Sequence, residues 1–160
     1  GNHIGPAYLR FGRPKWPIFT ESIKDFQIGK GIKFQDGNDI SIFATGHMLW
    51  QALEAEKMLF SIGISCEIIN IHTIKPLDEK IILESVKKTK CAISCEEHNI
   101  IGGLGESISR LLSENYPIPF KVIGVNDSFG ESGKPLELLD KYNLSPEFIK
   151  KSVQEVLKKK

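Results

Sequence analysis

Apolar positions along this chain fall into two kinds of run that alternate almost to its C-terminus. The segment Ile40–Ala44 is nearly continuous in apolar residues, which is typical of a strand buried on both faces. The next segment places apolar residues at roughly helical spacing and stops at Gly63, a residue type that commonly ends helices. Strands are expected at 32–35, 40–44, 66–71, 91–95 and 120–125, and helices at 47–62, 76–86, 104–112, 136–142 and 145–156.

This order of elements predicts an α/β fold. Strands that alternate with helices favour a mostly parallel sheet with helices on both faces, a three-layer α/β/α architecture with right-handed crossovers. The segment Asp36-Gly37-Asn38-Asp39 has the composition of a tight turn, so the first two strands are expected to run antiparallel. The turn leaves open whether those two strands are neighbours in the sheet.

The first residues predict an element that belongs to another domain. Ala7 to Phe11 has the pattern of a short strand, and the prolines at positions 14 and 17 indicate a linker. A lone strand is marginal because its backbone needs a hydrogen-bonded neighbour. We therefore expect residues 1–24 to be the last strand of a preceding domain plus a linker, and residues 25–160 to form one complete domain, so that the chain is a fragment or a separate subunit.

Composition narrows the classes of function. The chain has 160 residues, of which 41% are hydrophobic and 26% charged, as is typical of a globular domain. The net charge of +1 gives no electrostatic reason to expect nucleic acid or a membrane as partner, and no apolar run is long enough to cross a bilayer. Three cysteines without disulfide-like spacing favour a reducing compartment, so we expect a cytoplasmic protein.

The stretch from Cys95 to Glu106 carries the densest candidate chemistry. It leaves an apolar strand through Glu96, Glu97 and His98 and enters a helix through a glycine cluster. A histidine beside carboxylates could serve acid–base chemistry. Neighbouring residues of a strand point to opposite faces, however, so the two glutamates cannot face one substrate atom while the strand continues. A polar, hydrogen-bonded strand end is therefore the favoured interpretation.

The glycine cluster consists of Gly102, Gly103 and Gly105. Its spacing matches neither the dinucleotide-binding fingerprint nor a phosphate-binding P-loop. Two interpretations are open. The glycines could allow the backbone to approach an anion or another chain closely, or they could make a tight turn and close packing between helix and sheet.

Cysteine and histidine residues form weaker patterns. Cys91, Cys95 and His98 invite a metal site, but they lack a nearby fourth ligand and the two cysteines lie on a predicted strand. Buried structural cysteine is therefore favoured. His47 and His72 are lone histidines at strand ends and are expected to be polar loop residues.

Two other segments could bind phosphate. Ser132-Gly133-Lys134 lies in a polar loop after the last predicted strand and could cradle a phosphate or simply cap a helix. Arg10 and Arg13 flank the end of the first strand-like run. A guanidinium there could bind a phosphate through two hydrogen bonds, or it could remain an ordinary surface charge.

Five segments are more specific in combination. They read GPAYLRFGR, IFATGHM, INIHTIKPLDE, EEHNIIGGLGE and IGVNDSFGESGKPLELLDKYNLSPEFI. In order and spacing, over nearly the whole chain, they resemble the C-terminal domain of transketolase-type thiamine diphosphate enzymes. The last segment most resembles transketolase itself, especially the split form whose C-terminal half is a separate chain. Similar modules end 1-deoxyxylulose-5-phosphate synthase and the beta subunits of 2-oxo acid dehydrogenases.

The resemblance implies a five-stranded sheet whose first strand is antiparallel and need not lie beside the second. It implies a transferase that moves two-carbon ketol units between sugar phosphates, as in the pentose phosphate pathway. Thiamine diphosphate and magnesium would bind between the preceding domains, so this fragment would bind neither and would be inactive alone. Its partners would be the N-terminal thiamine-binding domains or subunit, and a second copy in a homodimer.

The resemblance also assigns residues. Arg13 matches an arginine that contacts the sugar phosphate in transketolases, and Arg10 matches the first arginine of a similar pair in the synthase. Glu97, His98 and the glycine cluster match a motif near domain and subunit contacts, so none of them is expected to be catalytic. The rival hypothesis is a regulatory or assembly module that binds a partner chain or a small anion at the glycine cluster.

Overall fold

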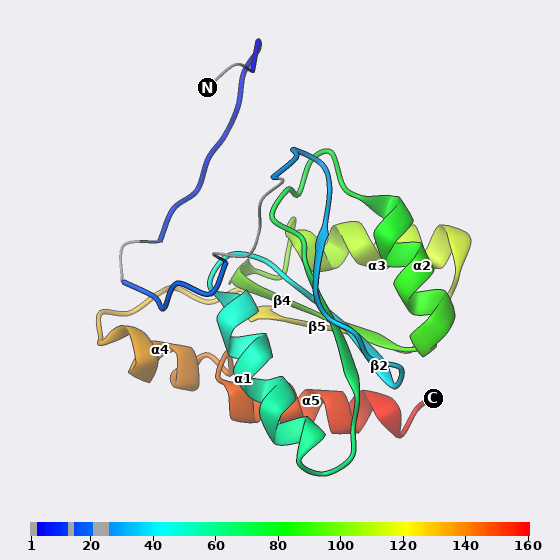
Figure 1. Ribbon diagram of the computed structural model, residues 1–160. Helices are drawn as coiled ribbons and strands as arrows, with labels where there is room; N and C mark the ends of the chain where they lie inside the picture. The colour runs from blue at the N-terminus through cyan, green and yellow to red at the C-terminus, as the bar shows by residue number, and fades with distance from the viewer. Residues whose placement is uncertain (1–2, 13–14, 21–25) are drawn as a thin grey trace.

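The computed structural model describes residues 3–12, 15–20 and 26–160 (Figure 1). Helices α1 and α5 cover one face of a five-stranded sheet, and α2 and α3 cover the other, which confirms the three-layer prediction. The elements in chain order are β1 (Ile32–Gln35), β2 (Ile40–Ala44), α1 (Met48–Phe60), β3 (Cys66–Asn70), α2 (Glu79–Thr89), β4 (Ala92–Asn99), α3 (Leu104–Asn115), β5 (Phe120–Val125), α4 (Pro135–Lys141) and α5 (Pro146–Leu157).

The sheet is mixed, with strand order β1-β3-β2-β4-β5. Strand β1 pairs antiparallel with β3, and every other pair is parallel. The first two strands therefore run in opposite directions, as expected, but β3 lies between them. Their connecting turn crosses the beginning of β3, where a Cβ atom on Gly37 would lie 2.5 Å from the backbone nitrogen of Glu67. A side chain would collide with the backbone there, so the turn needs its glycine.

The two faces of the sheet bury separate apolar cores. Strand β2 lies in the middle and is buried along its whole length, as its continuous apolar run predicts. The residues of β2 alternate between the two cores because successive side chains of a strand point to opposite faces. Ile40 and Ile42 pack with residues of α1 and α5, whereas Phe43 packs with residues of α2 and α3.

Local signals set the helix ends. Gly63 follows α1 with φ at +81°, in the left-handed region that glycine favours. Asp78 caps α2: its carboxylate accepts a hydrogen bond from the backbone N–H of Ile81 at 3.4 Å. The same carboxylate accepts a second bond from the N–H of Gly31 at 2.9 Å, which fastens the segment leading into β1 to this helix. None of the helices in the described parts of the chain is long and apolar enough to span a membrane.

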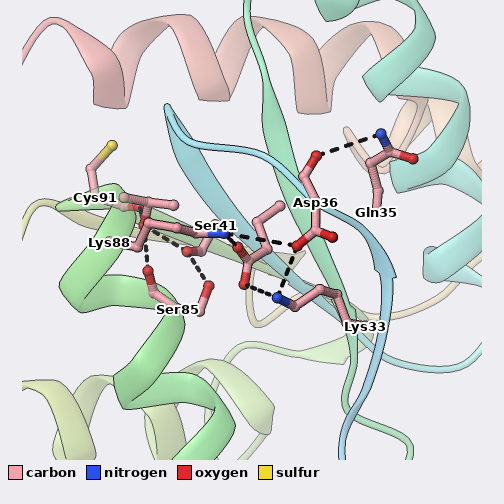
Figure 2. Close-up of polar contacts among 9 residues, drawn as sticks. Lys33, Gln35, Asp36, Ser41, Ser85, Lys88 and Cys91 are labelled. Carbon is pink, nitrogen blue, oxygen red and sulfur yellow. Dashed lines mark hydrogen bonds and ion pairs between the residues drawn. The ribbon is translucent and has the colours of Figure 1, made fainter.

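An ion network around the buried Glu67 carboxylate fastens the edge strand β1 at the amino ends of the parallel strands. The Glu67 carboxylate, 3% exposed, contacts the Lys88 ammonium from α2 and lies 3.4 Å from the Lys33 ammonium of β1. Figure 2 shows both lysines beside Asp36, with Ser41 and Ser85 forming a hydrogen bond next to them. This network lies at the opposite end of the sheet from Glu97.

The first described segment, residues 3–12, extends away from the globular domain, although the Arg10 side chain reaches back to it. Residues 3–12 are exposed and extended, and no strand is assigned among them (Figure 1). A strand-forming sequence without a neighbouring strand is expected to remain in this state. Phe19, further along, packs against Phe34 and Trp50 of the domain. That residues 1–24 belong to a preceding domain and a linker stays a prediction.

Candidate functional site

Four side chains from three distant segments meet at the carboxyl ends of the parallel strands. Glu97 lies near the end of β4, and His47 lies in the turn between β2 and α1. Arg10 and Trp16 come from the N-terminal segment. We refer to Arg10, Trp16, His47 and Glu97 as the edge cluster. The carboxyl edge of a parallel sheet is where ligand and partner sites usually form in α/β domains.

Glu97 is the centre of the edge cluster. Its Oε2 atom lies 3.1 Å from His47 Nδ1 and 3.7 Å from Arg10 Nη2. Arg10 Nη2 also donates a hydrogen bond to the Glu97 backbone oxygen at 3.2 Å. The indole of Trp16 stacks on the His47 ring, with centroids 4.6 Å apart and an angle of 2° between the planes. Residues on both sides of the stretch 11–15 therefore contact the same pair of domain residues.

His47 is the most buried ionisable member of the edge cluster. Its side chain is 10% exposed, and burial lowers the pKa of His47. Glu97 raises that pKa and Arg10 lowers it, but burial is the largest influence. The ring is therefore neutral near pH 7, and its Nδ1 atom lies 3.1 Å from the Glu97 carboxylate.

Glu96 points the opposite way, into the protein. Its side chain is buried, and its two oxygens accept hydrogen bonds from the N–H groups of Leu104 and Gly105, each at 2.8 Å. Burial raises the pKa of Glu96, although these two hydrogen bonds act to lower it. Glu96 therefore caps the start of α3 while Glu97 faces the surface, as the alternation along a strand predicts.

The structure gives a local reason for glycine at each position of the glycine cluster. Gly102 has φ at +75°, in the left-handed region. A Cβ atom on Gly103 would lie 2.6 Å from the Glu96 carboxyl carbon, and one on Gly105 would lie 2.7 Å from Val122 Cγ2. These contacts favour a tight turn and close helix–sheet packing.

Three backbone N–H groups at the start of α3 donate to carboxylates. Glu96 accepts from Leu104 and Gly105, and Glu106 accepts from Gly102 at 2.9 Å. A phosphate at the glycine cluster would have to displace these negative groups, which disfavours anion binding there. Residues 3–12, 15–20 and 26–160 contain no group of three or more His, Cys, Asp or Glu side chains suited to a metal.

The other predicted site residues have different outcomes. Arg13 falls outside the described residues. His98 is exposed, with Nδ1 2.9 Å from the backbone oxygen of Asn99. Cys91 and Cys95 are buried, and burial raises the pKa of both thiols, so neither is poised as a thiolate ligand.

The loop Ser132-Gly133-Lys134 is exposed and leads into α4. The ammonium of Lys134 lies 3.3 Å from the Glu137 carboxylate in the first turn of that helix. Lys134 precedes the first turn of α4, but its side chain makes no capping hydrogen bond, so neither a phosphate site nor a side-chain cap is supported by these contacts.

The sequence did not predict the roles of His47 and Trp16. His47 lies in a turn, as expected, but its ring is buried under an indole instead of being a solvated loop side chain. One signal was present: His47 follows a buried strand at the edge where Glu97 also lies. A second was Trp16, a large apolar residue inside a proline-containing linker sequence.

Comparison with known proteins assigns the chain to a family. Residues 29–149 match the family described as transketolase, C-terminal domain. The chain is 39% identical to the 6-deoxy-6-sulfo-D-fructose transketolase subunit SqwH of Clostridium sp. (strain MSTE9), over 99% of this chain and 49% of that protein. It is 43% identical to a putative transketolase C-terminal section of Methanocaldococcus jannaschii, over 97% of this chain and 49% of that protein. The chain thus spans about half the length of these relatives.

A solved structure gives the same result. A split-gene transketolase, described as an inactive beta4 tetramer, superposes with a TM-score of 0.81 at 42% identity. The match covers 84% of this chain and 44% of that one. Together with the sheet order and the matched range, these likenesses show that the chain belongs to the transketolase C-terminal domain family.

Proposed function

We propose that this chain is the C-terminal part of an enzyme that transfers two-carbon ketol units between sugar phosphates, and that it is inactive without a thiamine-binding partner. The observation that carries the proposal is the edge cluster, which presents an arginine at the carboxyl edge of the sheet. Carboxylates occupy the N–H groups of Gly102 and Gly105, so the exposed guanidinium of Arg10 is the better placed group at this edge to receive an anion.

The Arg10 guanidinium is exposed enough, and has enough N–H donors, to bind an anion. Its side chain is 53% exposed, and its contacts with Glu97 involve Nη2. A guanidinium has five N–H donors, so donors remain for a phosphate. Arg13 lies three positions further along, and the family resemblance suggests that it also contacts the sugar phosphate.

The remaining surface residues near this edge support a role in assembly. Ile101 and Phe129 are large apolar side chains that follow β4 and β5, and both are exposed. We propose that this surface, together with Glu97, His98 and the exposed Gly102, contacts the thiamine-binding partner and a second copy of the chain. The partner would hold thiamine diphosphate and magnesium, and the cofactor would supply the electron sink for ketol transfer.

The test of this function uses the chain alone and then the enzyme reconstituted with its partner. The chain mixed with thiamine diphosphate, magnesium and sugar phosphates should give no turnover, and measurable turnover would contradict the proposal. In the reconstituted enzyme, Arg13→Ala should raise KM for phosphorylated sugars far more than KM for unphosphorylated ones. Equal effects on both would remove Arg13 from the phosphate site.

One relative suggests a second substrate class. The Clostridium protein is named for a sulfo sugar, and a guanidinium binds a sulfonate through the same donors as a phosphate. The kcat/KM values of the reconstituted enzyme for fructose 6-phosphate and for 6-deoxy-6-sulfo-D-fructose separate the two classes. Preference for the phosphate supports the first proposal, and preference for the sulfonate supports the second.

A further inference from the structure

The contacts of the edge cluster form a chain that runs from the surface inward. Arg10 contacts Glu97, Glu97 contacts His47, and His47 stacks with Trp16. Exposure falls in the same order, from 53% for the Arg10 side chain and 42% for Glu97 to 10% for His47. Arg10 is therefore oriented by the less exposed Glu97, and Glu97 by the still less exposed His47.

The stacked rings of Trp16 and His47 are the most buried end of this chain of contacts. The indole Nε1 of Trp16 and Nε2 of His47 are both buried, so the two rings exclude water from each other. Phe19, three positions later, packs against Trp50 of α1 at 5.3 Å between ring centroids. The N-terminal segment is thus attached to the domain by the aromatic side chains of Trp16 and Phe19 and by the Arg10–Glu97 ion pair.

We propose that Glu97 and His47 are positioning residues that hold Arg10 at the carboxyl edge of the sheet, ready to bind the phosphate of the sugar substrate. This role rests on the proposed function. A free arginine side chain loses much rotamer freedom when it binds a ligand. Holding the guanidinium in place beforehand reduces that loss, so the benefit should appear in substrate binding instead of in the chemical step.

The kinetic test uses the enzyme reconstituted with its partner, assayed with D-xylulose 5-phosphate and with unphosphorylated D-xylulose. Glu97→Gln should raise KM for D-xylulose 5-phosphate about fivefold, the upper range for an exposed ion pair, and leave kcat unchanged. KM for D-xylulose should stay constant. If Glu97 had a merely structural role, Glu97→Gln would change KM for both substrates by the same factor.

Two further variants sharpen the assignment. Glu114→Gln removes an exposed carboxylate from the Arg110–Glu114 pair on α3 and should leave both KM values unchanged. His47→Asn retains an N–H near the position of Nδ1. It should therefore raise KM for D-xylulose 5-phosphate less than His47→Ala does. If Glu97→Gln behaves like Glu114→Gln with D-xylulose 5-phosphate, the positioning role is overturned.

A second arm uses the chain alone and does not depend on catalysis. With Trp50→Phe as background, fluorescence reports on Trp16. His47→Ala should increase acrylamide quenching of Trp16 at least twofold, whereas Glu114→Gln should not. Unchanged quenching in His47→Ala would refute the stack and the positioning role with it. If the stack is present but the reconstituted wild-type enzyme transfers no ketol unit, the proposed function fails, and the phosphate role of Arg10 fails with it.

Discussion

The Gly103→Ala substitution tests how the start of α3 is built. Gly103 has φ at −96° and ψ at −164°, an extended conformation that alanine adopts without strain. The added Cβ atom would lie 2.6 Å from the Glu96 carboxyl carbon, well inside van der Waals contact. The buried carboxylate must therefore move away from the two N–H groups that it accepts from, at 2.8 Å each.

The expected cost follows from those two hydrogen bonds. A hydrogen bond to a charged group contributes about 1.5–3 kcal/mol, so losing one or weakening both should cost about 2–4 kcal/mol. Alanine offsets about 0.5–1 kcal/mol of this by restricting the unfolded chain. Gly103→Ala should therefore lower the free energy of unfolding by about 1–3.5 kcal/mol, measured by urea denaturation followed by circular dichroism at pH 7.

A double-mutant cycle separates this mechanism from a general intolerance of alanine. In the Glu96→Ala background the Cβ atom of residue 103 meets no carboxylate, so Gly103→Ala should cost less than about 1 kcal/mol. Gly46→Ala is a control for backbone strain alone, because Gly46 has φ at +58° and no atom within 4 Å of its Cβ position. An equal cost of Gly103→Ala with and without Glu96 would refute the explanation.

Three further predictions address packing, charge and pH. Gly105→Ala should lower the free energy of unfolding by about 1–3 kcal/mol in urea, and Val122→Ala should partly restore it by making space; no rescue would contradict the close helix–sheet packing. Lys88→Met should cost about 1–3 kcal/mol, because Glu67 stays buried with one lysine fewer, and an unchanged melting temperature would contradict this. The pKa of His47 is lowered in the folded chain, so its folded environment disfavours protonation. The contribution of the buried, neutral His47 ring to the free energy of unfolding is complete above the unfolded-state pKa of about 6.5. It is lost as the pH falls below that value and through the lowered pKa of the folded chain. An NMR titration of His47 with a midpoint above about 6.5 would contradict the burial argument.

Hydrophobic periodicity was sufficient to predict the layers of the fold. The continuous apolar run of β2 indicates burial on both faces, and that property is local to the sequence. The insertion of β3 between β1 and β2 is not local. The Asp36–Asp39 turn looks the same whether it closes a hairpin or crosses a third strand, and the difference lies in the contact of Gly37 with the start of β3.

The candidate site was predictable only where its geometry depends on local sequence. Strand alternation placed Glu96 and Glu97 on opposite faces without any tertiary information. The choice between the two interpretations of Gly103 needed the position of a carboxylate seven residues earlier in the chain. The Arg10–Glu97 contact joins residues 87 positions apart, and nothing in either local sequence specifies it.

The most direct test of the central claim is a ketol-transfer titration. A fixed amount of a thiamine-binding partner that co-purifies with this chain is mixed with increasing amounts of the chain, in the presence of thiamine diphosphate, magnesium and sugar phosphates. We expect no transfer from either component alone and activity that saturates at an equimolar ratio. Transfer by the chain alone, or no gain on mixing, would contradict the proposal that this chain is the C-terminal part of a two-component transketolase.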